Sequence, residues 1–354
     1  MVEQQKKTYV PRERAFAALF PHAPAYRWRQ CVMTLFQPMC RGWKDATALP
    51  ADMRVTMEES LPWMTVEQFL LLESKKKDTY KAALKLHDGA RIETVLMRNA
   101  RDSWTICVSS QVGCAMGCRF CSTGTMGLVR NLYADEIVDQ YRFWTSFLAD
   151  HPHLPQTVGN IVFMGMGEPL TNYDNVKEAI LTLLAHTTLG PTRVVVSTVG
   201  VIPQLARLLA DPTWPPVRIA LSLHSAVAQT RKEIVPTSYE NFLTDLTAWA
   251  HTYHAAIGTR RRHLTFEYVM LRDVNDTPAH AKALAQLATA IGKVKVNLIP
   301  YNFGTAAEFQ KSTDETIVVF QNILKKHGII ATRRRTMGDD IAAACGQLVV
   351  QTKR

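Results

Sequence analysis

The segment around residue 118 constrains the fold more than any other part of the chain. It holds Cys114, Cys118 and Cys121 at the spacing C-x3-C-x2-C. Thiolates at such spacing usually hold a metal ion or an iron–sulfur cluster. A complete protein cage for zinc or for a [4Fe–4S] cluster has four ligands, so three thiolates leave one position free to bind and activate a small molecule. We therefore expect a tight loop around a compact metal centre.

A structural zinc site is the alternative for these cysteines, with Cys107, seven residues before Cys114, as the fourth ligand. The chain has seven cysteines, an odd number that argues against a secreted disulfide framework. Its first residues, MVEQQKKTYVPRER, are polar, and no apolar run reaches the length of a membrane span. We expect a cytoplasmic protein that makes no contact with a membrane.

Lysine and arginine outnumber aspartate and glutamate by 41 to 31, which gives a formal charge of +10. Basic runs occur at residues 75–77, 260–262 and 333–335. Each run alone is usually a solvated surface. Together with the net charge they favour a nucleic acid as partner, because basic side chains neutralise its phosphates.

The first part of the chain is expected to form a small helical accessory domain, residues 1–78. Residues 12–20, 26–37 and 65–73 have helical character, and prolines lie between them. Residues 79–102 are expected to form a β-hairpin linker, because Asp88-Gly89 between alternating runs is a strong turn signal. The remaining residues, 103–354, are expected to form the core of the protein.

In that core, predicted strands and helices alternate. The strands are expected at residues 104–109, 160–164, 193–197, 218–223, 264–270 and 295–299, with a last strand at 329–335. The helices are expected at residues 134–148, 174–187, 202–210, 239–253 and 278–291. Such alternation builds a parallel sheet with helices outside, as an open barrel or as a doubly wound sheet.

Polar and glycine-rich segments follow the predicted strands at their carboxyl ends. The cysteine loop follows the first strand, Gly167-Glu168 the second, Ser197 ends the third and His224 the fourth. In both candidate folds the functional residues gather at these strand ends. We therefore expect them to share one site.

These segments together resemble the RlmN/Cfr family of radical-SAM RNA methyltransferases, and the resemblance covers nearly the whole chain. It is carried by the cysteine loop and by GMGEPLTN (165–172), STVGVIP (197–203), SLHS (222–225), EIVP (233–236), FEYVMLRDVND (266–276), VNLIPYN (296–302) and GDDIAAACGQL (338–348). The resemblance implies an α/β fold, a partial (β/α)6 TIM-like barrel that forms the radical-SAM core, preceded by the helical accessory domain and the β-hairpin.

The resemblance also implies the cofactors and the catalytic residues. Cys114, Cys118 and Cys121 would bind a [4Fe–4S] cluster, and two molecules of S-adenosylmethionine (SAM) would be used per turnover. One is cleaved to a 5′-deoxyadenosyl radical, and the other methylates Cys345. The methylene radical formed on Cys345 then adds to the adenine, and Cys107 resolves the adduct through a transient disulfide.

Glu93 matches the proton acceptor of the family, although one extra residue separates it from Cys107. Residues that would contact SAM are Gly167, Glu168, Ser197, Ser222, Leu223, His224 and Asn302.

Pro169 resembles the branch of the family that methylates adenine C2, whereas residues 121–130 have a partly C8-branch appearance. We expect C2 methylation of an adenosine in 23S rRNA, and also in tRNA, by a monomer that receives electrons from a donor such as flavodoxin. Three alternatives stay open: C8 methylation, a radical-SAM enzyme with a non-RNA substrate, and a zinc-bearing RNA-binding module.

Overall fold

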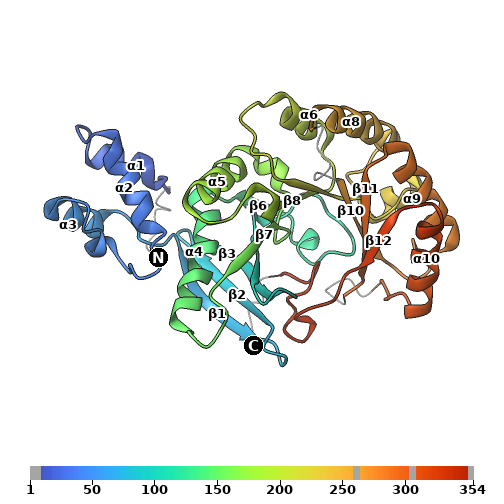
Figure 1. The fold of residues 1–354 in the computed structure, drawn as a ribbon, viewed down its shortest axis with the longest axis horizontal. Helices are drawn as coiled ribbons and strands as arrows, with labels where there is room; N and C mark the ends of the chain where they lie inside the picture. Colours follow the sequence, from blue (N-terminus) through green and yellow to red (C-terminus); the bar gives the residue numbers. More distant parts are fainter. Residues whose placement is uncertain (1–8, 258–263, 303–307, 350–354) are drawn as a thin grey trace, which may run out of the picture.

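The computed structural model describes residues 9–257, 264–302 and 308–349, and Figure 1 shows a curved sheet lined by helices with a small helical unit beside it. The described strands form one ten-stranded sheet and a separate pair, β5 (Gln111–Gly113) with β6 (Leu128–Asn131). Seven neighbouring strands of the large sheet run parallel and follow chain order: β4 (Trp104–Cys107), β7 (Val158–Phe163), β8 (Val194–Thr198), β9 (Arg218–Ser222), β10 (Leu264–Met270), β11 (Val294–Pro300) and β12 (Ile330–Arg333).

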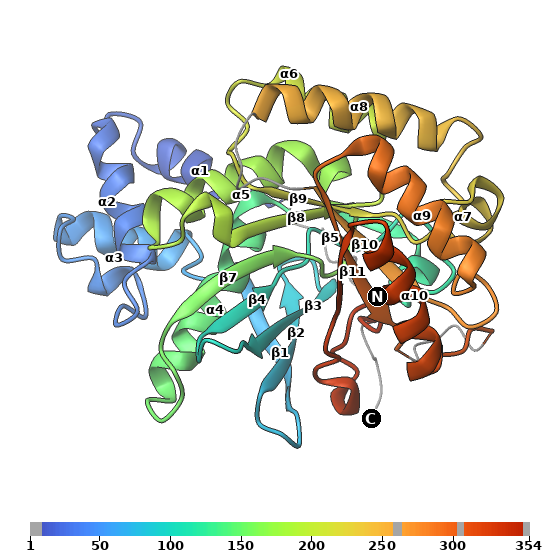
Figure 2. The ribbon, with the colours of Figure 1, turned by 45° about the vertical axis from the view of Figure 1, so that its right-hand side comes forward.

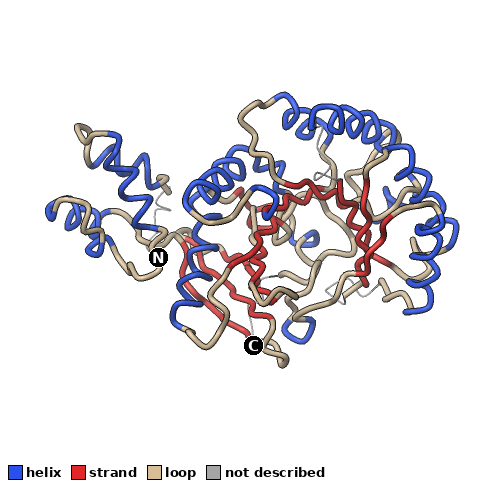
Figure 3. The backbone as a smooth tube through the Cα atoms, in the orientation of Figure 1, coloured by secondary structure: helices blue, strands red, loops and turns tan. Residues whose placement is uncertain are grey.

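The parallel strands curve into an open ring, and helices cover its outer face (Figure 3). These helices are α4 (Ala134–Asp150), α5 (Tyr173–His186), α6 (Ile202–Ala210), α8 (Phe242–Ile257), α9 (Pro278–Ile291) and α10 (Asp314–Lys326). The short helix α7 (Ala228–Ile234) follows β9. Strands covered on both faces are nearly continuous in apolar residues, and β10 has six of its seven residues buried. The predicted α/β partial barrel is confirmed.

Helix α10 lies outside the set predicted from the sequence. Thr313 caps it, because its Oγ1 accepts a hydrogen bond from the N–H of Thr316 at 3.2 Å. Its buried residues Ile317, Phe320 and Leu324 recur at helical spacing. The capping residue and the apolar spacing of this helix were therefore present in the sequence.

The prediction that residues 65–73 are helical is wrong. They form strand β1 (Val66–Glu73), which pairs antiparallel with β2 (Thr79–Leu86); β2 pairs with β3 (Arg91–Arg98), and β3 with β4. The run Leu70-Leu71-Leu72 has no clear period, so it fits either a strand or a buried helix, and pairing with β2 decides the outcome. The predicted hairpin therefore belongs to a three-stranded meander on the edge of the barrel sheet (Figure 2). Its turn is at Asp88-Gly89 as predicted, with Gly89 at φ +82°.

The N-terminal unit holds α1 (Arg12–Leu19), α2 (Ala25–Leu35) and α3 (Ala51–Ser60), the last of which was not predicted. These helices pack around their own apolar cluster, which includes Phe16, Trp43 and Met57. The domain boundaries after residues 78 and 102 stay a prediction.

Asp139 of α4 joins this helical unit to the barrel. Its fully buried carboxylate pairs with Arg12 of α1 and with Nη1 of Arg142, the latter at 2.6 Å. The backbone N–H of Thr65 donates to it at 2.7 Å. Burial alone would raise the pKa of Asp139, but the two guanidinium groups hold it below its ordinary value. The charge is thus compensated where the two units meet.

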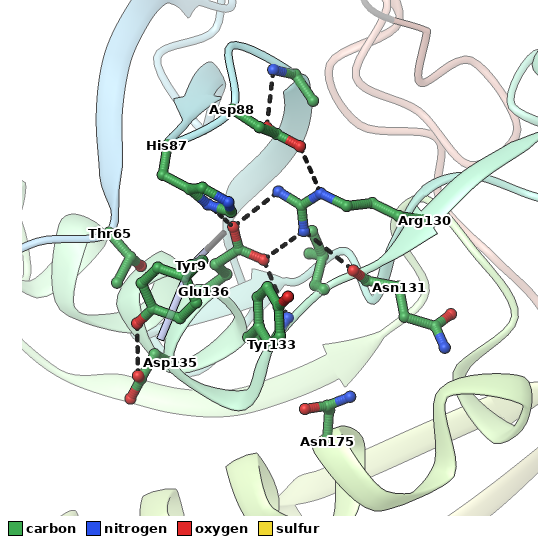
Figure 4. Close-up of polar contacts among 12 residues, drawn as sticks. Tyr9, Thr65, His87, Asp88, Arg130, Asn131, Tyr133, Asp135, Glu136 and Asn175 are labelled. Carbon is green, nitrogen blue, oxygen red and sulfur yellow. Dashed lines mark hydrogen bonds and ion pairs between the residues drawn. The ribbon is translucent and has the colours of Figure 1, made fainter. Parts of the chain in front are cut away.

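A second polar network ties the hairpin turn to the same helix (Figure 4). The carboxylate of Glu136 accepts hydrogen bonds from Nη1 and Nη2 of Arg130 at 2.8 and 2.9 Å, and Nε of Arg130 donates to Asp88 at 2.7 Å. Nearby, the hydroxyl of Tyr9 donates to Asp135 at 2.6 Å. The meander, strand β6 and the N-terminal segment are therefore all fixed to α4.

No helix in the described ranges is long and apolar enough to cross a lipid bilayer.

Candidate active site

The carboxyl ends of the parallel strands surround one cavity, which we call the main cavity. Many of the residues predicted from the sequence line it: Cys114, Cys118, Cys121, Gly167, Glu168, Ser197, Ser222, His224 and Cys345. They come from the cysteine loop, from the ends of β7, β8 and β9, and from the C-terminal loop. The expectation that strand-end residues share one site is met for this set.

The cysteine loop lies between β5 and β6 and is held by its own backbone hydrogen bonds. The N–H of Cys114 donates to Gly127 at 2.9 Å, and the N–H of Cys121 donates to Cys118 at 3.1 Å. Burial raises the pKa of the Cys114 thiol to about 12. Burial also raises the pKa of Cys118, and the neighbouring thiols of Cys121 and Cys114 raise it further. All three thiols are thus close enough to act on one another's charge.

This arrangement fits a cluster better than a single ion. In the described residues, no three or more His, Cys, Asp or Glu side chains are arranged to hold one metal ion. A [4Fe–4S] cluster sets a different requirement, because each thiolate binds a different iron atom. The three cysteines line one cavity, so all three would face a cluster bound there.

Glu168 is the buried acid of the main cavity. Oε2 accepts a hydrogen bond from the N–H of Val199 at 2.9 Å, and Oε1 accepts one from Leu170 at 3.1 Å. Burial raises the pKa of Glu168 to about 7, although these hydrogen bonds oppose the shift. Burial makes the ionised carboxylate unfavourable. A positively charged ligand group would offset this penalty, because an opposite charge favours the ionised form.

Gly167 lets the chain pass close to strand β5, which leads into the cysteine loop. Its φ is +101°, and a Cβ at this position would lie 2.6 Å from the Cβ of Gln111. Oε1 of Gln111 in turn accepts a hydrogen bond from the N–H of Glu168 at 2.8 Å. A larger residue at 167 would therefore displace Glu168 from the cavity wall.

The ends of β8 and β9 contribute hydroxyl groups and an imidazole. Oγ of Ser197 lies 3.1 Å from Oγ of Ser222. His224 has φ +59°, and its Nδ1 accepts a hydrogen bond from the N–H of Val269 at 3.1 Å. Burial lowers the pKa of His224 to about 3, so the ring is neutral. Leu223, also predicted to contact SAM, is buried but does not line the main cavity.

Cys345 reaches the main cavity from the C-terminal loop, far from the cysteine loop in sequence. The loop is held by backbone and side-chain hydrogen bonds to the cysteine loop: Ser122 N–H to Gly346 at 2.8 Å and Thr123 Oγ1 to Leu348 at 2.6 Å. Solvent reaches Cys345 through the cavities it lines.

Cys107, at the end of β4, is buried near Cys345. Burial raises its pKa to about 12, the charge of Cys345 adds to the shift, and Arg334 opposes it. Arg334 acts in the same direction on Cys345. All seven cysteines are free thiols in this structure. The two thiols of the predicted transient disulfide thus share one cationic neighbour.

Glu93 and Asn302, like Leu223 and Cys107, do not line the main cavity. Glu93 is buried in an ion pair with Lys81 (Oε1–Nζ 3.1 Å) and accepts a hydrogen bond from the N–H of Val349 at 3.1 Å. Asn302 donates to the carbonyl oxygen of Cys345 at 3.4 Å. Both residues hold the C-terminal loop in this structure. Their predicted roles, proton acceptor and SAM contact, stay predictions.

Three charged functional candidates were missed: Glu267, Arg231 and Arg334. Glu267 lines the main cavity, and its buried Oε2 has no hydrogen-bond donor within the described part of the chain; its cation is Arg334, with Nη1 at 3.5 Å. Arg231 is buried and donates to Ser222, Leu223 and Val199. A charged residue inside an apolar strand, as in FEYVM, was the signal for Glu267. Nothing in the sequence around Arg334 distinguishes it from Arg333 and Arg335, which are exposed.

Comparison with known proteins gives concordant results. The Radical SAM superfamily matches residues 108–279. The chain is 40% identical to the "Dual-specificity RNA methyltransferase RlmN" of Desulfotalea psychrophila, over 92% of this chain and 89% of that protein. It is 36% identical to the "Probable dual-specificity RNA methyltransferase RlmN" of Aquifex aeolicus, over 92% and 91%.

Among solved structures, a radical SAM methyltransferase from Sphaerobacter thermophilus superposes with a TM-score of 0.87 at 37% identity. The match covers 96% of each chain, so it extends well beyond the barrel.

Proposed function

The chain belongs to the RlmN/Cfr family of radical-SAM RNA methyltransferases, and on that basis we propose that it methylates C2 of an adenosine in 23S rRNA and in tRNA, with Cys345 as methyl carrier. The observation that carries the proposal is that Cys345 and the three cysteines at C-x3-C-x2-C spacing line the same cavity. A methyl carrier is useful only where it can meet the species that activates it.

Cys114, Cys118 and Cys121 would hold the [4Fe–4S] cluster. When bound, the cluster supplies the electron that cleaves SAM reductively, and this gives access to a carbon radical able to attack an electron-poor ring carbon. The chain positions SAM beside it. Glu168 offers a carboxylate to the SAM ammonium group, and Ser197 and Ser222 offer hydroxyl groups to its polar atoms.

Cys345 first takes a methyl group from SAM. Its thiolate attacks the methyl carbon, the bond from that carbon to the sulfonium sulfur breaks, and S-adenosylhomocysteine leaves with the electron pair. Thiolates are the reactive form of cysteine. Burial raises the pKa of Cys345 above its ordinary value, and the positive charge of Arg334 opposes that shift and so favours the thiolate.

Cys107 would resolve the covalent adduct once the adduct has lost its ring proton and returned one electron to the cluster site. The Cys107 thiolate would attack the sulfur of Cys345, the bond from that sulfur to the methylene carbon would break, and the carbon would take up a proton to become the methyl group. An electron donor such as flavodoxin would supply the two electrons that reduce the resulting disulfide. Glu93 would accept the proton that leaves the ring. Burial raises the pKa of Glu93 above its ordinary value, so its carboxylate takes up a proton more readily than an exposed one. This role requires the Lys81 pair to open, because Glu93 does not line the main cavity.

Pro169 after Gly167-Glu168 favours C2 as the target carbon, and the relatives named dual-specificity RNA methyltransferases favour more than one RNA substrate. We propose a monomer that works in the cytoplasm. C8 methylation is the second candidate, favoured by residues 121–130.

The test uses anaerobically reconstituted protein, methyl-labelled SAM, and rRNA and tRNA from cells that lack the protein. Nucleoside analysis is expected to show 2-methyladenosine. Finding 8-methyladenosine would move the target carbon, and finding no methyladenosine with either RNA would overturn the function. Iron content discriminates the zinc-bearing module, which would carry one zinc and no visible absorbance. The Cys345→Ala variant is expected to yield no methylated protein.

A further inference from the structure

Cys345 lies between two cavities. It lines the main cavity together with the cysteine loop, and it also lines a second cavity, which we call the outer cavity. Arg334 and Ile299 line both as well. The outer cavity contains none of the cysteines at C-x3-C-x2-C spacing and neither Glu168 nor Ser197. It is thus a separate compartment that reaches the same thiol.

The residues that line the outer cavity carry positive charge only. Its charged residues are Arg98, Arg334 and Arg335, and no Asp or Glu of the described ranges lines it. Arg335 is 72% exposed, and its ion pair with Asp78 is long, at 3.5 Å. Arg98 pairs with the exposed Asp102. Such exposed pairs are weak in water, so both guanidinium groups are available to a phosphate, which they bind with two hydrogen bonds.

The rest of the outer cavity suits a flat heterocycle. Met97, Ile299 and Pro300 give it an apolar surface, and Asn99 and Asn302 add side-chain amides. Apolar surfaces carry stacked bases, and amides recognise base edges. An apolar surface with amides, set among guanidinium groups, matches the chemistry of a nucleotide.

The basic surface continues beyond the outer cavity. Arg335, Thr336 and Met337 also line an adjoining groove that contains Lys75 and Lys76. These two lysines are exposed at the turn between β1 and β2. Asp339 and Asp340 lie in that groove too, but Asp340 accepts a hydrogen bond from the N–H of Lys75 and Asp339 one from Gln347. A chain of phosphates leaving the outer cavity would therefore meet further cations.

We propose that the outer cavity receives the target nucleotide of the RNA, with its base against Met97, Ile299 and Pro300 and its flanking phosphates on Arg98 and Arg335. Cys345 then forms the wall between the SAM compartment and the base compartment. This inference rests on the proposed function and adds the entry route of the substrate. It also accounts for the exposure of the residue Cys345 in a loop that is held on both sides.

The test exploits two arginines that lie two positions apart. Arg335 lines the outer cavity, whereas Arg333 pairs with Asp314 of α10 and lines neither cavity. Arg335→Glu and Arg333→Glu make the same charge change, and each breaks one exposed ion pair. Binding of a labelled RNA hairpin containing the target adenosine to the reconstituted holoenzyme is measured by anisotropy over a range of salt concentrations.

Arg335→Glu is expected to weaken RNA binding at least tenfold. The slope of the logarithm of the association constant against the logarithm of the salt concentration is expected to become less steep by about one, because one phosphate contact is lost. Arg333→Glu is expected to change affinity less than twofold. Equal effects of the two variants, or none from Arg335→Glu, would overturn the proposal. If Arg335→Glu does not fold, as judged by circular dichroism, Arg98→Glu replaces it with the same criteria.

A second measurement locates the base. An RNA with 8-azidoadenosine at the target position is irradiated on the wild-type holoenzyme, and crosslinked peptides are identified by mass spectrometry. Crosslinks within residues 97–99 or 299–302 are expected, and crosslinks confined to other segments would overturn the placement. Failure of the proposed function looks different: crosslinking here would persist while nucleoside analysis of wild-type reactions showed no methyladenosine.

Discussion

The backbone N–H of Ser122 donates to the carbonyl oxygen of Gly346 at 2.8 Å, which ties the residue after Cys121 to the residue after Cys345. The bond joins two loops that lie more than two hundred residues apart in the sequence. Thr123 adds a second link, from its Oγ1 to the carbonyl oxygen of Leu348 at 2.6 Å. The cysteine loop and the C-terminal loop therefore support each other, and a change in one is expected to loosen the other.

Thr123→Val tests this link. Valine has the shape of threonine but cannot donate, so the buried carbonyl oxygen of Leu348 loses its partner, at a cost of about 1–2 kcal/mol. We expect faster hydrogen–deuterium exchange in residues 339–349 of the metal-free protein. Thr125→Val is the control, because its hydroxyl bonds to Ser122 within the same loop and is exposed. Equal protection of residues 339–349 in both variants would contradict the link.

The buried pair of Lys81 and Glu93 also holds the C-terminal loop. Nζ of Lys81 donates a hydrogen bond to the carbonyl oxygen of Ala342 at 3.0 Å. Lys81→Met leaves the Glu93 charge buried without its cation, and we expect a loss of about 3–5 kcal/mol in unfolding free energy. Lys85→Met on the same strand breaks only the exposed pair with Glu67 and is expected to cost less than about 1 kcal/mol. Denaturant titration of both variants measures these losses of unfolding free energy. Similar losses in the two variants would show that the Lys81–Glu93 pair contributes little to stability.

The fold of the core was predictable because its signals are local. Strands such as β10 are apolar along most of their length, and helices such as α9 begin at a capping Thr277 followed by Pro278. The cysteine loop and Glu168 were predictable because short motifs follow strand ends, and topology brings strand ends together.

Features that depend on pairing between distant segments were not predictable. Val66–Glu73 is a strand only because β2 lies beside it. Arg334 belongs to a run of three arginines, and the sequence does not say that it alone faces both thiols while Arg333 pairs with α10. Glu93 matches a family motif, but only the structure shows Lys81 at 3.1 Å.

Glu168 makes the stability of the metal-free protein depend on pH. Its pKa rises from 4.5 to about 7 on folding, so the native state binds its proton more tightly than the unfolded state does. The stabilisation that Glu168 contributes is therefore fully present at pH values below its pKa in the unfolded state. It falls as the pH rises to the pKa of the folded state, by about 3 kcal/mol at 1.36 kcal/mol per pKa unit. Urea titrations at pH 5 and pH 8 are expected to show this fall in the wild type and a smaller one in Glu168→Gln. Glu233→Gln, an exposed control, should keep the pH dependence of the unfolding free energy seen in the wild type. If stability falls as much in Glu168→Gln as in the wild type, a group other than Glu168 causes the pH dependence.

Cys107 provides the last prediction, because it is buried at the end of β4 and within reach of the Cys345 charge. If it resolves the adduct between Cys345 and the adenine, Cys107→Ala should stop the reaction after the carbon–carbon bond has formed. Protein covalently joined to RNA is then expected to accumulate to about one equivalent, visible as a shifted band on a denaturing gel and as a Cys345 peptide carrying a nucleotide. Cys40→Ala, which alters a thiol of the N-terminal unit outside the main cavity, should give free methylated RNA and no shifted band. Free methylated RNA at wild-type yield from Cys107→Ala would remove Cys107 from the mechanism and leave its position beside Cys345 without a catalytic role.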